Sequence, residues 1–236
     1  MYLRCCALFV FSSLAASLAA PSAFATEARV GEAVVVQNNV ERVADDATNP
    51  VKVGDSMLRD EVVRTGIDSA ARFVMADSTN LSIGPSASIK LDRTVFNDEH
   101  SYRDIAIQLT NGAFRFVTGH SEKAAYKITT PLATIGVRGT ILDILSQRGR
   151  TTVVLQEGAA NVCTLGFQCI QLTKVGDTAV ITVTGGKTTI HKTHGSAWNF
   201  AAACAATAGL CTVNSYAAAS PTVSPPVDDG GILCGR

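Results

Sequence analysis

Short runs in which apolar and polar residues alternate constrain the fold of this sequence more than any other feature. Successive side chains of a strand face opposite sides, so this alternation is typical of strands with one buried face. The runs are rich in β-branched residues and cover residues 33–36, 62–65, 72–76, 81–83, 88–91, 105–109, 113–117, 126–129, 141–145, 152–155, 170–172, 179–184 and 188–191. We expect an all-β fold of many short strands, in a solenoid-like, sandwich-like or barrel-like arrangement.

Turn residues separate these runs. Asn111-Gly112 and Gly185-Gly186 predict hairpins, because primed turns need positive φ angles that Gly and Asn adopt at little cost. The sequence Lys-Val-Gly-Asp at residues 52–55 returns at residues 174–177. We interpret the two copies as similar tight turns leading into strands, with the Asp bonding to an amide two residues on.

The first 25 residues have the layout of a secretory signal peptide. Arg4 precedes an apolar stretch at residues 5–11, and Ala23-Phe24-Ala25 offers a small-residue cleavage site after Ala25. The alternative is a retained membrane anchor, but serines and Pro21 interrupt the apolar run, and a spanning helix needs about 20 apolar residues. We therefore expect an exported protein, periplasmic or secreted, with no membrane span once the signal is removed.

Charge and composition narrow the class of partner. The 236 residues carry 20 Lys and Arg against 20 Asp and Glu, so no net charge attracts nucleic acid or tethers the chain to anionic lipid. A hydrophobic fraction of 47% with only 17% charged residues provides enough apolar surface for a folded core. We expect a folded protein that does not bind nucleic acid.

The cysteines agree with export. Seven are present, and after signal removal Cys163 and Cys169, Cys204 and Cys211 have spacings that suit two local disulfides. Cys234 is left over; it pairs with another of these, cross-links two chains or stays free. Neither pair has zinc-ligand spacing, so we expect no metal.

The composition changes after residue 194. Ser196 is a candidate cap for a helix through Phe200 and the alanine run to Ala208, with Gly209 as its stop. Residues 221–236 are rich in Pro, Gly and Asp, which predicts a flexible tail. We divide the chain into a signal peptide (1–25), a β domain (26–194), a helical segment (195–220) and a disordered tail (221–236).

Catalytic patterns are absent from the sequence. The four imidazoles, at positions 100, 120, 191 and 194, lie in segments expected to be exposed, and no nucleophile motif accompanies them. Residues 185–188 mimic the end of a phosphate-binding loop but lack the preceding glycine. We expect no enzymatic activity and no cofactor.

Several ordered motifs resemble the FecR domain family. They occupy residues 62–66, 69–70, 73–84, 86–91, 109–114, 128–140 and 153–162, and the resemblance extends over residues 54–183. The most specific part combines Thr130-Pro131 with Arg138-Gly139-Thr140 and, further on, Glu157-Gly158. We interpret these residues as scaffold: the Pro at a strand edge, Gly139 where the backbone turns or passes closely, and Glu157-Gly158 in a turn.

The resemblance implies a solenoid-like module that senses or contacts another protein or an envelope polymer outside the cytoplasm, in signalling. Regulators of this family hold sigma factors through a cytoplasmic region before the module, and residues 26–52 do not resemble one. We therefore do not expect direct sigma-factor binding. Two alternatives remain open: an exported hydrolase with an unrecognised site, and a structural surface element cross-linked by Cys234.

Overall fold

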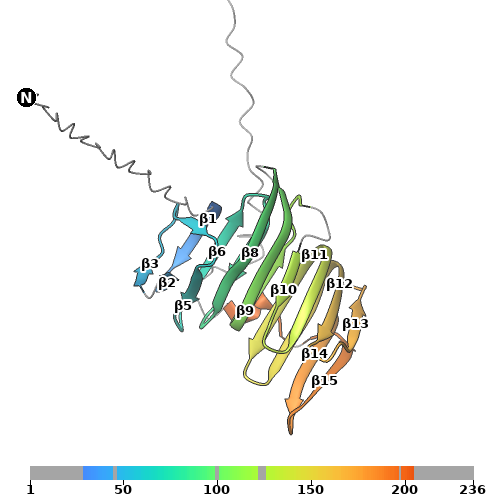
Figure 1. Ribbon diagram of the computed structural model, residues 1–236. Helices are drawn as coiled ribbons and strands as arrows, with labels where there is room; N and C mark the ends of the chain where they lie inside the picture. The colour runs from blue at the N-terminus through green and yellow to red at the C-terminus, as the bar shows by residue number, and fades with distance from the viewer. Residues whose placement is uncertain (1–28, 45–46, 99–100, 122–125, 197, 205–236) are drawn as a thin grey trace, which may run out of the picture.

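The computed structural model describes residues 29–44, 47–98, 101–121, 126–196 and 198–204. In these residues the fold is nearly all β, with one helical turn near the end (Figure 1). The elements are β1 (Arg29–Gln37), β2 (Val40–Ala44), β3 (Ala47–Pro50), β4 (Ser56–Leu58), β5 (Val62–Thr65), β6 (Ala70–Met75), β7 (Asn80–Ile83), β8 (Ser88–Asp98), β9 (Ser101–Val117), β10 (Tyr126–Thr129), β11 (Ala133–Gln147), β12 (Arg150–Thr164), β13 (Cys169–Leu172), β14 (Asp177–Thr184), β15 (Lys187–His194) and α1 (Phe200–Cys204).

The all-β prediction is confirmed, and every run expected to form a strand lies within one, except that Ala76 is one residue past the end of β6. Strands β2, β3 and β4 were not expected. The prediction of uniformly short strands is wrong for β9, β11 and β12, which are 17, 15 and 15 residues long. These long strands determine the architecture.

The fifteen strands form one hydrogen-bonded sheet that folds back on itself into two layers. Layer A contains β3, β2, β5, β8, the first half of β9, β10, the first half of β11, the second half of β12 and β13. Layer B contains β4, β1, β6, β7, the remaining halves of β9, β11 and β12, then β14 and β15. The three long strands belong to both layers, and the strands follow one another along the molecule (Figure 1).

The main apolar core lies between the layers, and a smaller cluster of Ala113, Phe200 and Cys204 lies on the outer side of layer B. In β9 the fully buried apolar residues have odd numbers up to Leu109 and even numbers at Phe114 and Phe116. The same change of phase separates Val137 from Leu142 in β11. Because side chains alternate with period two, one extra residue at each bend reverses the alternation and keeps the apolar side chains inside.

The bend in β9 lies at Gly112, which corrects the hairpin expected at Asn111-Gly112. Asn111 is the last partner of β8, and Gly112 is the first of the residues that pair with β11. Gly112 has φ +104°, and a Cβ there would lie 2.4 Å from the Cα of Ala87. Glycine is required here because the backbone passes from one layer to the other in close contact with Ala87 and with a positive φ.

The bends of β11 and β12 lie side by side. Register shifts in their pairing fall between Arg138 and Leu142, where Gly139 has φ +56° and Gly158 opposite has φ +81°. Glu157-Gly158 therefore lies within β12, and the turn expected there is wrong. An extra residue without a ladder partner turns both strands together, so the hairpin crosses from one layer to the other as a unit.

The two Lys-Val-Gly-Asp copies form the same turn. The carboxylate of Asp55 accepts from the amide of Lys52 at 2.9 Å, and that of Asp177 accepts from the amide of Lys174 at 3.0 Å. Asp177 also receives Lys192 Nζ of the edge strand β15 at 2.7 Å. The two turns are similar, as expected, but the expected bond to an amide two residues on is wrong: each Asp accepts from an amide three residues back along the chain.

The helical turn α1 covers part of the outer side of layer B. Asp143 is fully buried there and binds Arg115 through two bonds of 2.6 and 2.8 Å. Its Oδ2 also accepts from the amide of Phe200 at 3.1 Å, and the Phe200 ring lies under the Arg115 guanidinium. The side chain of Ser196 accepts from the amide of Trp198, so it caps a turn ahead of α1. The rest of the expected helix, to Ala208, and the tail lie outside the described residues.

Replacing Gly158 by Ala should unfold the protein much more readily than replacing Gly149. Both glycines have positive φ, so both variants bear a left-handed penalty of about 1–2 kcal/mol. A Cβ at Gly158 would also lie 1.9 Å from the carbonyl oxygen of Gly139, whereas one at Gly149 meets nothing within 4 Å. We expect the free energy of unfolding to fall by about 1–3 kcal/mol more in G158A than in G149A, measured by urea unfolding followed by circular dichroism. Equal losses would show that the close approach is unimportant.

Asp177→Asn should remove a pH-dependent contribution to stability. The bond from Lys192, followed by those from the amides of Thr173 and Lys174, lowers the pKa of Asp177 well below its ordinary 3.8. A lowered pKa in the folded state stabilises above the unfolded value, and this stabilisation is lost as the pH falls through the acid range. We expect the free energy of unfolding, measured with urea, to be higher for the wild type than for the variant at pH 7. This difference should become smaller below about pH 4. Asp68→Asn, which removes an exposed carboxylate from another turn, is the control for the loss of one negative charge.

Candidate functional site

The family-like residues gather around the bend of β11 and β12. Thr140 is buried there, and its Oγ1 accepts from the amide of Arg138 at 2.8 Å and donates to the carbonyl of Ala159 at 2.8 Å. Its own amide donates to Thr118 Oγ1 at 2.9 Å, and the amide of Thr118 donates to the Thr140 carbonyl. These bonds satisfy the backbone groups that the bulge removes from the ladder.

The other family-like residues lie at the opposite end of the same strands. Thr130, between β10 and β11, is buried and its Oγ1 accepts from the amide of Ala133 at 3.0 Å. The same hydroxyl lies 3.2 Å from Thr151 Oγ1 and so links the two layers. Pro131 is exposed in this turn, and Glu157 is exposed on β12 near the bend.

An open pocket of about 520 Å³ lies beside the bend, over β10, β11, β12 and β13. Its exposed lining comes from Gly136, Arg138, Asn161, Gln171 and Thr173. A Cβ added to Gly136 would meet nothing within 4 Å, so the missing side chain leaves part of this space open. Arg138 is the cation in this lining, and the two amides can both donate and accept hydrogen bonds.

A buried polar network supports the same end of the molecule. Asp77, in the turn between β6 and β7, accepts from Ser121 Oγ at 2.6 Å, from the hydroxyl of Tyr126 and from the amide of Thr79 at 2.9 Å. The amide of His120 donates to the carbonyl of Asp77 at 2.8 Å. The network thus joins layer B, the segment after β9 and the first residue of β10.

Tyr126 connects this network to the pocket, whose lining it shares. Its ring meets Phe116 edge-on at 5.5 Å between centroids. Burial raises the pKa of Tyr126, and the bond to Asp77 adds to this effect. The hydroxyl therefore stays protonated and donates to the carboxylate. This bond holds the tyrosine side chain in place in the lining of the pocket.

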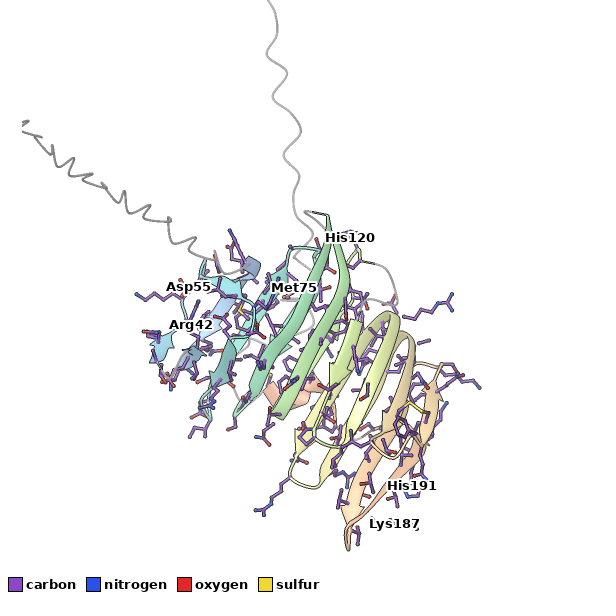
Figure 2. The ribbon with its side chains drawn as sticks, in the orientation of Figure 1. Arg42, Asp55, Met75, His120, Lys187 and His191 are labelled. Carbon is purple, nitrogen blue, oxygen red and sulfur yellow. A yellow bond between two sulfur atoms is a disulfide. The ribbon has the colours of Figure 1, made fainter. Side chains whose placement is uncertain are left out.

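The histidines of the described residues lie apart. His120 contacts the Asp77 carbonyl, and His191 is exposed on β15, far from His120 (Figure 2). His194 lies 3.5 Å from Asp177. His100 lies outside the described residues. No cluster of three or more His, Cys, Asp or Glu suited to a metal occurs in the parts of the chain that the structure describes.

A disulfide joins Cys163 and Cys169 across the β12–β13 hairpin. Cys204 is also disulfide-bonded. Cys211 and Cys234 lie outside the described residues. In the described segments no helix has the length and apolarity needed to span a membrane.

The sequence of residues 61–161 matches the model of the family described as FecR protein. This stretch is similar to a FecR domain. The match includes the bend, Thr130-Pro131, the Asp77 turn and most of the pocket, but not β13–β15. It is narrower than the resemblance over residues 54–183 expected from the motifs.

Two crystal structures of a candidate anti-sigma factor from Parabacteroides distasonis are similar to this chain, with TM-scores of 0.45 and 0.47 at 13% and 14% sequence identity. Each comparison covers 58% of this chain and 60% of that chain, which is less than two thirds of its length. No curated protein matches the sequence.

Sequence reasoning singled out the bend residues of the FecR-like stretch but missed Gly136, Asn161 and Asp77. All three lie within the family-like stretches, at residues 128–140, 153–162 and 73–84. Gln171 lies outside these stretches and comes from β13. A gap left by a glycine and a buried network depend on contacts between distant strands, and a single sequence carries no direct signal of them.

Tyr126→Phe and Ser121→Ala should affect stability in a coupled manner. Both hydroxyls donate to the same oxygen of Asp77, and a hydrogen bond to a charged group contributes about 1.5–3 kcal/mol. Removing the second hydroxyl leaves the buried carboxylate with fewer donors, so it should lower the free energy of unfolding more than removing the first. We expect a double-mutant cycle in urea unfolding to give a coupling energy of about 0.5 kcal/mol or more. Additive losses would show that the two donors act independently.

Proposed function

We propose that this protein is an exported, non-enzymatic binding module of the FecR type, which contacts another protein or an envelope polymer and takes part in extracytoplasmic signalling. The single observation that carries the proposal is the pocket beside the bend, whose lining combines residues of two family-like stretches with Tyr126 and residues of β13. The signal-like first 25 residues and the disulfide between Cys163 and Cys169 support export.

The chemistry of the pocket suits a peptide-like segment. Arg138 can bind a carboxylate or a carbonyl, while Asn161 and Gln171 can pair with backbone amides. Tyr126 and Leu172 add apolar surface to the lining. A partner that presents an extended segment with an acidic group would meet each of these features.

The rigid surroundings favour recognition. The pocket spans neighbouring strands of one sheet, and the bend and the Asp77 network hold those strands in place. A preformed site loses little conformational entropy on binding, so even a small contact area gives useful affinity. In this proposal the FecR domain presents a fixed surface to its partner, with no chemical step.

Site-specific photo-crosslinking in intact cells tests the proposal. A photoreactive residue at Asn161, in the pocket, should give a discrete crosslinked species with an envelope component. The same residue at Val53, which is 64% exposed on a turn outside the pocket, should not. Mass spectrometry of the crosslinked species would identify the partner.

Gly136→Tyr provides the matched blocking variant. Because a side chain at this position meets open space, the variant should fold normally while filling the pocket. We expect it to abolish the Asn161 crosslink and leave the unfolding midpoint in urea within the error of the wild type. Crosslinking that persists at wild-type yield with the pocket filled would contradict the proposal.

A further inference from the structure

The hairpin between β12 and β13 carries two exposed apolar side chains at its tip. Phe167 is 91% exposed and Leu165 is 65% exposed. Isolated exposed apolar residues are common, but two large ones on a single short tip are a concentrated apolar feature.

This tip is held rigidly. The disulfide between Cys163 and Cys169 closes the loop, and the amide of Thr164 donates to the carbonyl of Gln168 at 2.8 Å. Phe167 has φ +62°, a left-handed conformation that bulky residues seldom adopt. The fold therefore fixes the phenyl ring in solvent, where it gains no burial within the described residues.

Strand register places other turns at the same end of the sheet. Ala133 pairs with Thr164, so the β10–β11 turn lies beside the tip. The contact between Thr130 and Thr151 brings the start of β12 to this level in the other layer. The turn before β12 and the β14–β15 hairpin project from this end, and Figure 2 shows Lys187 at the tip of the latter, far from His120.

At this end, the turns on the β9–β15 side of the sheet carry cations and no carboxylate, whereas the exposed Asp68 lies farther along, in the turn between β5 and β6. The turns at residues 110–112, 130–132, 147–150, 164–168 and 184–187 contain no Asp or Glu. Their cations, Arg148, Arg150 and Lys187, are all exposed. The other end of these strands has both signs of charge, with Asp77, Glu157 and Asp177 as well as Arg138 and Lys174. The zero net charge of the chain conceals the local excess of cations at the first end, because only the fold brings the distant turns together.

We propose that this end of the molecule is a peripheral membrane-binding surface. We call it the tip surface, and it consists of Leu165, Phe167, Arg148, Arg150 and Lys187. Its apolar side chains enter the interfacial region of an anionic phospholipid bilayer, and its cations contact the lipid phosphates. Aromatic side chains favour this interface, and cations near an anionic membrane add to the affinity.

Charge complementarity selects this occupant. An apolar pocket on a protein would accommodate Phe167 alone, whereas cations on neighbouring turns match a broad anionic plane. The turns come from both layers of the sheet, so they present several separate points of contact to a flat surface. The inference is independent of the pocket at the opposite end of the molecule, and neither proposal requires the other.

Tryptophan fluorescence of the full chain tests the proposal. Trp198 is the only tryptophan, so Trp198→Phe combined with Phe167→Trp places the sole indole at the tip. With vesicles of phosphatidylcholine and phosphatidylglycerol in a ratio of about 3:1, anionic enough to attract cations, we expect a blue shift and quenching by brominated lipid. The matched control combines Trp198→Phe with Val175→Trp, since Val175 is 65% exposed at the opposite end. Its emission should not change.

The charge contribution is tested in the same tryptophan background. Replacing Arg148, Arg150 and Lys187 by Ser should lower the vesicle partition coefficient by about a hundredfold, given the usual contribution of each cation near an anionic surface. Pure phosphatidylcholine vesicles or about 0.5 M salt should weaken binding similarly. An unshifted emission spectrum of the tip indole with anionic vesicles would overturn the proposal, and so would a burial of that indole that occurs only with a protein partner.

Discussion

The close approach of the Gly158 backbone to the Gly139 carbonyl is the contact on which the two-layer architecture depends. Two paired strands of 15 residues would otherwise continue as a flat ribbon with one face in water. At the bulge the pair leaves layer A and enters layer B, and the extra residue reverses the alternation so that apolar side chains still face inward. Thr140 bonds the backbone groups that the ladder loses. The apolar core and the pocket both follow from this crossing.

This crossing also shows what the sequence could and could not predict. Period-two alternation located the strands because it reflects which side chains are buried. The change of phase between residues 109 and 113 looked like the end of a strand, and the structure has instead a bend within β9. A hairpin and a bulge share the same local signal, a glycine flanked by alternating residues. Only the pairing partners, which are far away in the chain, distinguish them.

The candidate site also depends on contacts between strands that are far apart in the chain. Arg138, Gly139 and Gly158 could be selected from the sequence because they belong to a recognisable pattern. Their roles could not be assigned, since Gly158 matters through its contact with Gly139 across a ladder, and Gly136 matters through the space it leaves. The buried Asp77 could not be identified either, because adjacent residues give no sign of Ser121 and Tyr126 converging on it. A single sequence does not show which distant residues come into contact.

The two ends of the sheet can recognise different partners, because one end holds the bend of β11 and β12 and the other end holds the tips of the hairpins. The end with the bend of β11 and β12 holds a concave, hydrogen-bonding surface backed by a buried carboxylate. The other end presents hairpin tips, which protrude and contain cations and exposed apolar side chains. A module that contacts a membrane surface through the tips would hold its pocket away from that membrane, where a partner could reach it. The long strands then act as spacers, since their length sets the separation between the two surfaces.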